Sequence, residues 1–360
     1  MSVTTEPFGK TRDGRDITLF TITNSNGSVL KLTDLGAVWV SMFVKDKDGK
    51  LDDVVLGLKS GDRYETATYD AFGATVGRSA NRISHFRFTL NSKEYILADN
   101  DKGCNLHSGP DMYYFRLWDA QVVSEDSGEG VCFSLFSPDG DQGLPGNLDV
   151  SVTYLLTEDD SVIIDYHGVS DADTIINMTN HAYFNLAGHA SGTVHDELLW
   201  IDADYYTFGK NGEISDGQLH SVEGTPLDFR QLKRVGDEID CDDELVQLKG
   251  GYDHNFCLNN NGELALVAKV VHEGTGRYMD IFTDRPGLQV YTGNYISEKN
   301  EGKEGAVYHP RWGTAYETQH YPDAINHDNF PSPIVKAGEE FRSQTIYHFG
   351  IIGETQFYER

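Results

Sequence analysis

The chain has 360 residues, of which 57 are acidic and 29 are basic, giving a formal net charge of −28. A surface this acidic repels phosphate backbones and anionic lipid headgroups, which argues against nucleic-acid or membrane partners. The four cysteines are scattered and the first residues form no apolar signal segment, so we expect a reduced, cytoplasmic protein without disulfides.

Short strands joined by polar turns dominate the predicted secondary structure. The alternation of apolar and polar residues predicts strands, in chain order, over residues 41–44, 54–56, 86–90, 94–97, 150–156, 161–166 and 264–271. The first six pair up as three hairpins, because each pair flanks a run rich in Asp, Asn or Gly, the residues that favour tight turns.

Helical periodicity is scarce. It predicts a short helix over residues 228–235, capped by Asp228, and a single turn over residues 60–64. Closely spaced strands without alternating helices do not build parallel βαβ units, so the sequence favours an antiparallel β sandwich or barrel. No linker, internal repeat or low-complexity tract divides the chain, and residues 1–360 are therefore expected to form a single domain.

Five segments place polar residues among apolar neighbours, and they cover residues 77–83, 105–109, 179–186, 251–256 and 316–324. Burying a polar group without a partner costs about 1–3 kcal/mol, so each of these residues is either satisfied structurally or functional. Five such segments in one chain indicate a shared polar cavity. From the residues alone, a glycosidase-like pair of Asp253 and Glu317 stays open, whereas zinc, nucleotide and serine-hydrolase motifs are missing from the sequence.

Taken together, these segments resemble the galactose mutarotase (aldose 1-epimerase) family. Their sequences here are GRSANRI, CNLHSG, TNHAYFNL, GYDHNF and ETQHYPDAIN. The family patterns are approximately GRxANRI, NxLHGG, TNHxYFNL, GxDHNF and ETQxxPDAxN. Two further matches, TPLDFR and PGLQVYTGN, begin at Thr225 and Pro286, and all seven keep the family's order from about Gly77 to Pro331.

The resemblance implies a large antiparallel β sandwich that binds a sugar in an open cleft, without a metal or cofactor. Matched position by position, the family's general base falls on Glu317 and its general acid on His181. The sugar-binding residues of the family fall on Asn81, Arg82, His107, Asp253 and Gln289. Arg78 opens the first motif but does not match the sugar-contacting arginine, so we expect it to be structural.

The second motif departs from the family pattern in two places. Cys104 stands where the family has asparagine, and Ser108 stands where it has the first of two glycines. A positive φ at Ser108 would strain a serine more than a glycine, so we expect a small local adjustment around His107. The residues at 113–115 also replace a glycine-rich loop, which is expected to reshape the rim of the cleft.

The implied reaction, mutarotation, explains why an acid and a base suffice. Opening the hemiacetal ring removes the proton of O1 and adds a proton to O5, and closure on the other face reverses both transfers. We therefore expect Glu317 to begin ionised and His181 to begin protonated. Two alternatives are a hexose-6-phosphate epimerase, which needs basic residues at the cleft rim, and a non-catalytic sugar-binding relative, which would be expected to lack Glu317 or His181. Galactose and glucose are the expected substrates.

Overall fold

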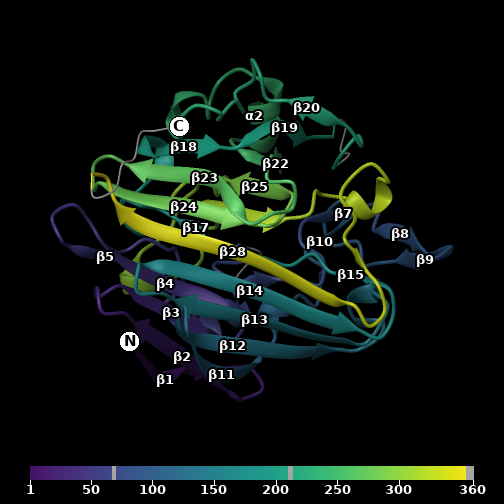
Figure 1. Cartoon of the computed structure of the whole chain (residues 1–360), viewed down its shortest axis with the longest axis horizontal. Helices are drawn as coiled ribbons and strands as arrows, with labels where there is room; N and C mark the ends of the chain where they lie inside the picture. The colour runs from purple at the N-terminus through teal and green to yellow at the C-terminus, as the bar shows by residue number, and fades with distance from the viewer. Residues whose placement is uncertain (67–69, 210–213, 354–360) are drawn as a thin grey trace.

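Antiparallel strands make up most of the regular structure of the chain, which a computed structural model describes for residues 1–66, 70–209 and 214–353. The largest sheet within these residues has nine strands. Their spatial order is β11 (Asp119–Glu125), β12 (Gly128–Ser137), β13 (Leu148–Leu156), β14 (Ser161–Ser170), β28 (Glu340–Ile351), β24 (Arg277–Thr283), β23 (Ala265–His272), β18 (Leu198–Ile201) and β21 (Lys233–Arg234). Strand β28 joins the two halves of this sheet, because it pairs with β14 on one side and with β24 on the other (Figure 1).

Two further sheets of the described residues complete the framework. The six-stranded sheet has the order β17 (Tyr183–Phe184), β26 (Thr314–Gln319), β25 (Gly287–Tyr291), β22 (Asp253–Leu258), β19 (Ala203–Thr207) and β20 (Leu219–Ser221). The five-stranded sheet runs in sequence order through β1 (Ser2–Lys10), β2 (Asp16–Thr23), β3 (Val29–Thr33), β4 (Val38–Lys45) and β5 (Leu51–Asp53).

Short pairs and turns connect these sheets. The two-stranded pairs are β10 (Cys104–Leu106) with β7 (Arg82–Ser84), β15 (Thr174–Ile175) with β27 (Ile334–Val335), β16 (Thr179–Asn180) with β6 (Thr75–Val76), and β8 (Arg87–Leu90) with β9 (Lys93–Ile96). The α helices of the described residues are α1 (Gly61–Thr66) and α2 (Glu244–Lys249). Single 3₁₀ turns occur at Tyr113–Phe115, Asp141–Gly143, Val194–Asp196, Val235–Asp237, Lys303–Gly305 and Ala324–Asn326. No helix in the parts of the chain that the structure describes is long and apolar enough to cross a membrane.

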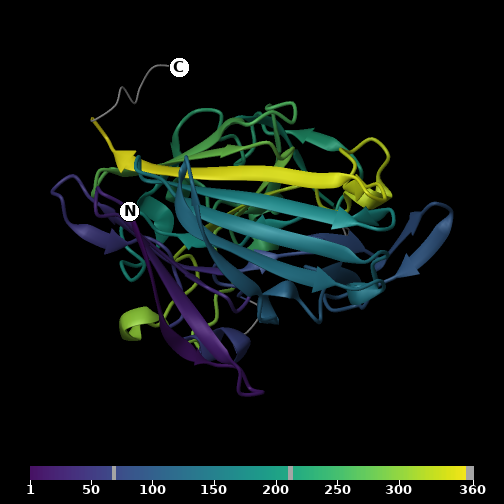
Figure 2. The same ribbon diagram turned by 60° about the horizontal axis from the view of Figure 1, so that its bottom comes forward.

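The main hydrophobic core contains side chains from all three large sheets. Trp39 of β4, Tyr347 of β28 and Tyr316 of β26 are each at most 1% exposed and belong to this core. The ring of Trp39 lies edge-on to that of Tyr347, with ring centroids 5.4 Å apart. The predicted all-β architecture of packed antiparallel sheets is therefore confirmed, and the β8–β9 hairpin projects from one side of it (Figure 2).

The strand predictions are largely confirmed, with one shift. Two of the predicted hairpins are β8–β9 and β13–β14, and the predicted strand at 264–271 is β23. The predicted partner of residues 41–44 is shifted, because β4 pairs with β5 at Leu51–Asp53, and residues 54–56 keep one bond to β4, from the N–H of Val54 to the carbonyl of Met42 at 2.9 Å. The latter residues turn away toward β17, where the backbone N–H of Leu56 donates to the carbonyl of Tyr183 at 2.9 Å.

Of the two helix predictions, one is approximately confirmed and one is wrong. Residues 60–64 correspond approximately to α1, but the helix predicted over residues 228–235 was wrong. Asp228 does cap a local turn, since its Oδ1 accepts from the backbone N–H of Arg230 at 3.3 Å, but the chain then extends into β21. Helix α2 was not predicted. Its signals are the cap Asp243, which accepts from the N–H of Leu245, and Gly250, which ends the helix with φ of 66°.

Candidate active site

One face of the six-stranded sheet carries three of the predicted site residues. In the antiparallel ladders, Gln289 of β25 lies opposite Glu317 of β26, and Asp253 of β22 lies opposite Tyr291 of β25. Directly opposite residues share a face, and so do residues two apart on one strand. The alternation of these strands therefore places Asp253, Gln289 and Glu317 together.

His181 reaches the same place from the edge of that sheet. It lies between β16 and β17, where Tyr183 pairs with Ala315 of β26. Extending this register by two residues sets His181 opposite Glu317. The backbone N–H of His181 donates to the carbonyl of Ala74 at 2.9 Å, so the chain is fixed where the side chain leaves it.

Asn81, Arg82 and His107 come from the β7–β10 pair. Leu106 of β10 pairs with Arg82 of β7, and the N–H of His107 donates to the carbonyl of Asn81 at 2.9 Å. A second hydrogen bond joins the same two residues, because Nδ1 of His107 accepts from the N–H of Asn81 at 3.1 Å. This short sheet therefore presents three polar side chains at one point.

All seven predicted site residues line one pocket of about 350 Å³, a volume in the usual range for a small-molecule site. Segments more than two hundred residues apart in sequence thus meet around one cavity. Six further described residues line the same pocket, and sequence reasoning did not select them: Asp70, Leu106, Tyr183, Tyr291, Tyr295 and Ser297. Leu106, Tyr183 and Tyr291 lie inside the matched motifs but belong to residue types that usually pack in a core, and Asp70, Tyr295 and Ser297 lie in no motif.

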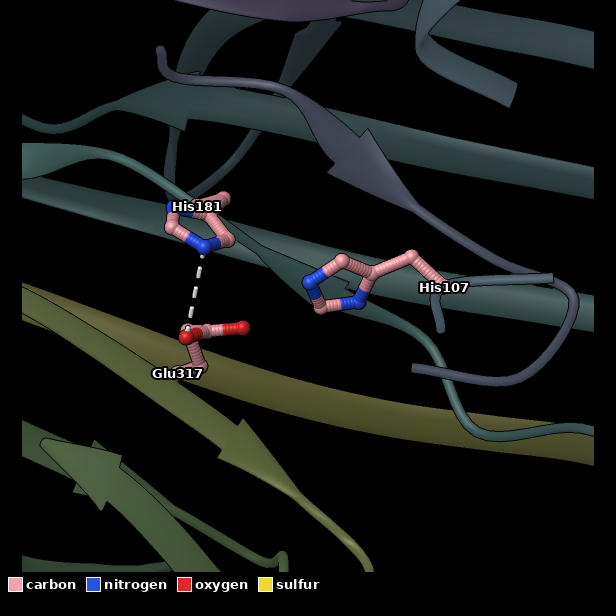
Figure 3. A group of neighbouring side chains, drawn as sticks. All are labelled: His107, His181 and Glu317. Atoms are coloured by element: carbon pink, nitrogen blue, oxygen red, sulfur yellow. Dashed lines mark ion pairs between the residues drawn. The ribbon is translucent and has the colours of Figure 1, made fainter. Parts of the chain in front are cut away.

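The pocket brings an acid–base pair into contact. Nε2 of His181 lies 3.5 Å from Oε1 of Glu317, and both side chains are at least 93% buried (Figure 3). Burial raises the pKa of Glu317 to about 8 and lowers the pKa of His181 to about 4. Burial thus favours a neutral carboxylic acid beside a neutral imidazole in the free pocket, which differs from the expected carboxylate and imidazolium by the position of one proton.

The third side chain of this group, His107, is directed toward the other two (Figure 3). Ligand atoms of His107, His181 and Glu317 all lie within 4.8 Å of one another. Because Nδ1 of His107 accepts a backbone N–H, its proton resides on Nε2 in the neutral ring. Burial, and secondarily the neighbouring His181, lowers the pKa of His107 well below 6.5, so His107 offers a neutral hydrogen-bond donor. A metal ion needs a lone pair at Nε2, and this tautomer does not supply one.

The remaining side chains form a hydrogen-bonded wall. Nε2 of Gln289 donates to Oδ1 of Asp253 at 2.6 Å, and Nδ2 of Asn81 donates to Oε1 of Gln289 at 3.2 Å. Nε of Arg82 donates to Oδ2 of Asp101 at 2.7 Å. Burial alone would raise the pKa of Asp253, but the charges of Lys249 and Arg82 outweigh it and hold that pKa below its usual value. The wall therefore combines a carboxylate acceptor with cationic and amide donors, a set suited to sugar hydroxyls.

Arg78 and the departures in the second motif lie outside this wall. The guanidinium of Arg78 is fully buried and donates to the carbonyls of Pro145 and Gly146 at 2.9 and 3.1 Å. Ser108 has a φ of 56°, and its hydroxyl accepts from the N–H of Ser79 at 2.8 Å, a bond that glycine could not make. Tyr113 and Tyr114 are buried, Phe115 packs against a hydrophobic cluster, and none of the three lines the pocket, so the expectation that residues 113–115 reshape the rim was wrong.

The fold and the pocket together define a class of protein: packed antiparallel β sheets with a buried glutamate–histidine pair in a polar pocket of small-molecule size. A family model for aldose 1-epimerase matches residues 18–348. Galactose mutarotase of Sus scrofa is 36% identical over 351 residues, covering 98% of this chain and 99% of that protein. Aldose 1-epimerase of Escherichia coli K12 is 37% identical over 342 residues, covering 94% of this chain and 96% of that protein.

Solved structures agree with these relatives. Galactose 1-epimerase from Lactobacillus acidophilus superimposes with a TM-score of 0.85 at 27% identity, covering 98% of this chain and 99% of that one. A GalM/aldose epimerase homologue from C. elegans superimposes with a TM-score of 0.84 at 28% identity, covering 93% of this chain and 99% of that one. The chain therefore belongs to the aldose 1-epimerase family.

Proposed function

We propose that the protein interconverts the α and β anomers of free hexoses, galactose and glucose, with His181 and Glu317 as the acid–base pair. The observation that carries this proposal is the 3.5 Å separation of His181 Nε2 and Glu317 Oε1 inside a pocket that also holds five candidate sugar-binding residues. O1 and O5 of a hexose are both bonded to C1. An acid and a base a few ångströms apart can therefore reach both oxygens in one bound sugar.

The proton count of the pair fits this reaction. The expected starting state and the state that burial favours both hold one proton in the pair. Ring opening moves the O1 proton to Glu317 and the His181 proton to O5, which leaves a neutral carboxylic acid beside a neutral imidazole. That is the distribution favoured by burial in the free pocket. The pocket is thus suited to the open-chain aldehyde, and hydrogen bonds from the bound ring sugar must shift the proton to His181 before opening.

The open-chain form must turn about C1–C2 without leaving the pocket. We assign Asn81, Arg82, Asp253 and Gln289 to the hydroxyls remote from C1, because hydrogen bonds link Asn81, Gln289 and Asp253 and hold Arg82 on Asp101. His107 is the fifth candidate sugar-binding residue and lies beside the acid–base pair. A site built to hydrogen-bond hydroxyls strongly rejects analogues that lack them, so these residues set substrate choice.

The charge of the pocket favours neutral sugars over hexose 6-phosphates. Among the described residues that line the pocket, Arg82 is the one lysine or arginine, whereas Asp70, Asp253 and Glu317 are acidic. Arg82 is itself paired with Asp101. A phosphate would need several cationic donors that are not already engaged. The presence of both His181 and Glu317 likewise supports a catalyst over a sugar-binding relative.

We also infer that the chain forms one domain located in the cytoplasm. The single-domain reading is supported by β28, near the end of the chain, which pairs with β14 and β24 in the middle of one continuous sheet. The location is supported by the four cysteines, which are all unpaired, as is usual for proteins kept in a reducing compartment.

Polarimetry tests the proposed activity directly. Purified protein is added to freshly dissolved α-D-galactose or α-D-glucose, and we expect the optical rotation to reach its equilibrium value faster than in buffer. The rate should rise linearly with protein concentration. No acceleration with either sugar would contradict the proposed reaction.

A further inference from the structure

Among the described residues, no other residue supplies His181 with the hydrogen bond that usually orients a catalytic histidine. In many sites the second ring nitrogen is held by a carboxylate or a carbonyl, which fixes both tautomer and orientation. Nδ1 of His181 is buried, and no other described residue provides it with a hydrogen-bond partner. Some other feature of the pocket must therefore hold the ring so that Nε2 faces Glu317.

Aromatic rings surround the imidazole of His181 and hold it by packing. The ring centroid of Tyr183 lies 5.0 Å from that of His181, and Tyr291 lies 6.3 Å away at an interplanar angle of 76°. The two tyrosine rings also contact each other, with centroids 5.9 Å apart. His107 approaches from another side at 5.6 Å and 85°. Edge-on and tilted arrangements at these distances are the favoured geometries of aromatic pairs.

Tyr291 is itself held by the segment that follows β25. Its hydroxyl accepts from the backbone N–H of Tyr295 at 3.0 Å. That segment is tied to Asp70, whose carboxylate accepts from the N–H of Ser297 at 3.3 Å and from Nδ2 of Asn300 at 2.6 Å. A continuous chain of contacts thus runs from Asp70 through the Tyr295–Asn300 backbone to Tyr291, and from Tyr291 to His181.

We propose that Tyr291, braced by the segment anchored on Asp70, is a positioning residue that holds the imidazole of His181 against Glu317. This inference rests on the proposed function, because it gives His181 its role in proton transfer. Packing fixes the ring while leaving Nδ1 without a charged partner. The imidazole is then free to gain and lose its proton at Nε2 without breaking a second hydrogen bond.

The first test compares two substitutions at Tyr291. Tyr291→Leu removes the ring that packs on His181, and we expect kcat to fall about 10–100-fold with little change in KM, since small misplacements of a catalytic group have effects of this size. Tyr291→Phe keeps the ring and loses only the hydroxyl that accepts from Tyr295, so its kcat should fall no more than the several-fold expected when Asp70 is removed. A kcat for Tyr291→Leu that equals that of the unmodified protein overturns the proposal.

A matched control separates positioning from a general loss of stability. Tyr308 does not line the pocket, and its buried hydroxyl donates to the carbonyl of Gly57 at 3.0 Å and contacts Nδ1 of His189 at 2.9 Å. Tyr308→Phe should lower Tm while leaving kcat unchanged. If kcat follows Tm across the Tyr308 and Tyr291 variants alike, the effect is structural and the proposal fails.

A titration by NMR tests the same point without activity. The ring protons of His181 should report a pKa of about 4 in the unmodified protein, and this pKa should rise toward 6.5 in Tyr291→Leu as water reaches the ring. An unchanged His181 titration in Tyr291→Leu overturns the proposal. Because this readout needs no turnover, it decides the positioning role even if polarimetry shows no epimerase activity.

A double-mutant cycle tests the role of Asp70. Asp70→Ala should lower kcat several-fold in the unmodified background and have almost no effect in the Tyr291→Leu background, because both changes act through the same ring. Losses that multiply in the double variant would show that Asp70 acts independently of Tyr291, and they would overturn that part of the proposal.

Discussion

Two glutamates of this protein are almost equally buried and differ in what surrounds them. Glu197 is 1% exposed and Glu317 is 3% exposed. Burial raises the pKa of each to about 8, and in each the Oε2 atom has no hydrogen-bond partner among the described residues. By burial, pKa and unsatisfied oxygen the two carboxyl groups cannot be told apart.

The residues around Glu197 and Glu317 distinguish the two carboxyl groups. Oε1 of Glu197 accepts from the backbone N–H of Leu186 at 2.7 Å, and its electrostatic influence reaches Tyr316 in the core. Oε1 of Glu317 instead lies 3.5 Å from His181 and faces the pocket. Tyr316 and Glu317 are consecutive residues of β26, so their side chains point to opposite faces of the sheet. One strand thus contributes to the hydrophobic core on one face and to the active site on the other.

The comparison shows that a raised pKa does not by itself identify a catalytic group. The same desolvation acts on both glutamates. The difference lies in a second titratable group within reach and in a cavity that admits a substrate.

The largest expected effect comes from replacing the two glutamates in turn. Glu317→Gln keeps the size of the side chain and removes its ability to accept a proton, so the rate of anomer exchange should fall by about 10²–10⁴-fold. Glu197→Gln should leave the rate unchanged. Polarimetry with α-D-galactose measures both, and circular dichroism verifies the fold. Equal losses in the two variants would remove the distinction between the two sites.

Glu317 was predictable from the sequence and Glu197 was not, for an identifiable reason. Glu317 lies in an ordered series of motifs, and the resemblance they carry assigned its role. Glu197 lies in no motif, and its burial results from packing between β18 and the residues after β17, which no local pattern records. Tyr183 and Tyr291 lie inside the motifs but were not assigned to the pocket, because an aromatic residue on a strand has the same pattern whether it faces a core or a cavity.

The fold was predictable where turns and alternation agree, as in the β8–β9 and β13–β14 hairpins. Prediction failed where tertiary contacts override local preference. Residues 54–56 have the composition of a strand, but Asp53 substitutes its carboxylate for a ladder acceptor by binding the N–H of Met42 at 3.0 Å. Helix α2 has 6 residues, which is too short for periodicity to reveal.

The pH dependence of activity should belong to the Glu317–His181 pair and not to Glu197. The pair needs one proton in total, which it holds between pH about 4 and about 8. Above that range both groups are deprotonated and no acid remains. Below it both are protonated and no base remains. We expect kcat/KM to be level between these limits and to fall about tenfold per pH unit beyond each.

This profile also tests the comparison. Glu197→Gln should reproduce the unmodified profile, because its carboxyl group does not face the pocket. A displaced alkaline limb in Glu197→Gln would mean that the two glutamates are electrostatically coupled.

Ionisation of Glu197 should affect the free energy of unfolding and not the rate of anomer exchange. Its pKa is raised from 4.5 to about 8 on folding, so between these values the folded state binds more protons than the unfolded state. The free energy of unfolding therefore decreases as pH rises through this window and levels off above pH 8. At full titration the difference is on the order of 5 kcal/mol, taking about 1.4 kcal/mol per pKa unit.

Glu197→Gln removes this contribution. Urea unfolding at pH 5 and pH 9 should show the variant close to the unmodified protein at pH 5 and more stable than it at pH 9. Glu317 keeps its own contribution in both proteins, so the difference isolates Glu197. Parallel losses of stability in the two proteins between pH 5 and pH 9 would contradict the raised pKa.

The smallest expected effect is that of a chelator. Of the two glutamates, Glu317 has two histidines beside it, so it is the one whose surroundings resemble a metal centre. The tautomer of His107 argues against that function, because the N–H of Asn81 occupies Nδ1 and leaves the proton on Nε2. Incubation with EDTA followed by removal of the chelator should leave both kcat and Tm unchanged. A loss of activity that zinc or another divalent cation restores would show that Glu317 acts as a ligand, and the acid–base assignment would have to be abandoned.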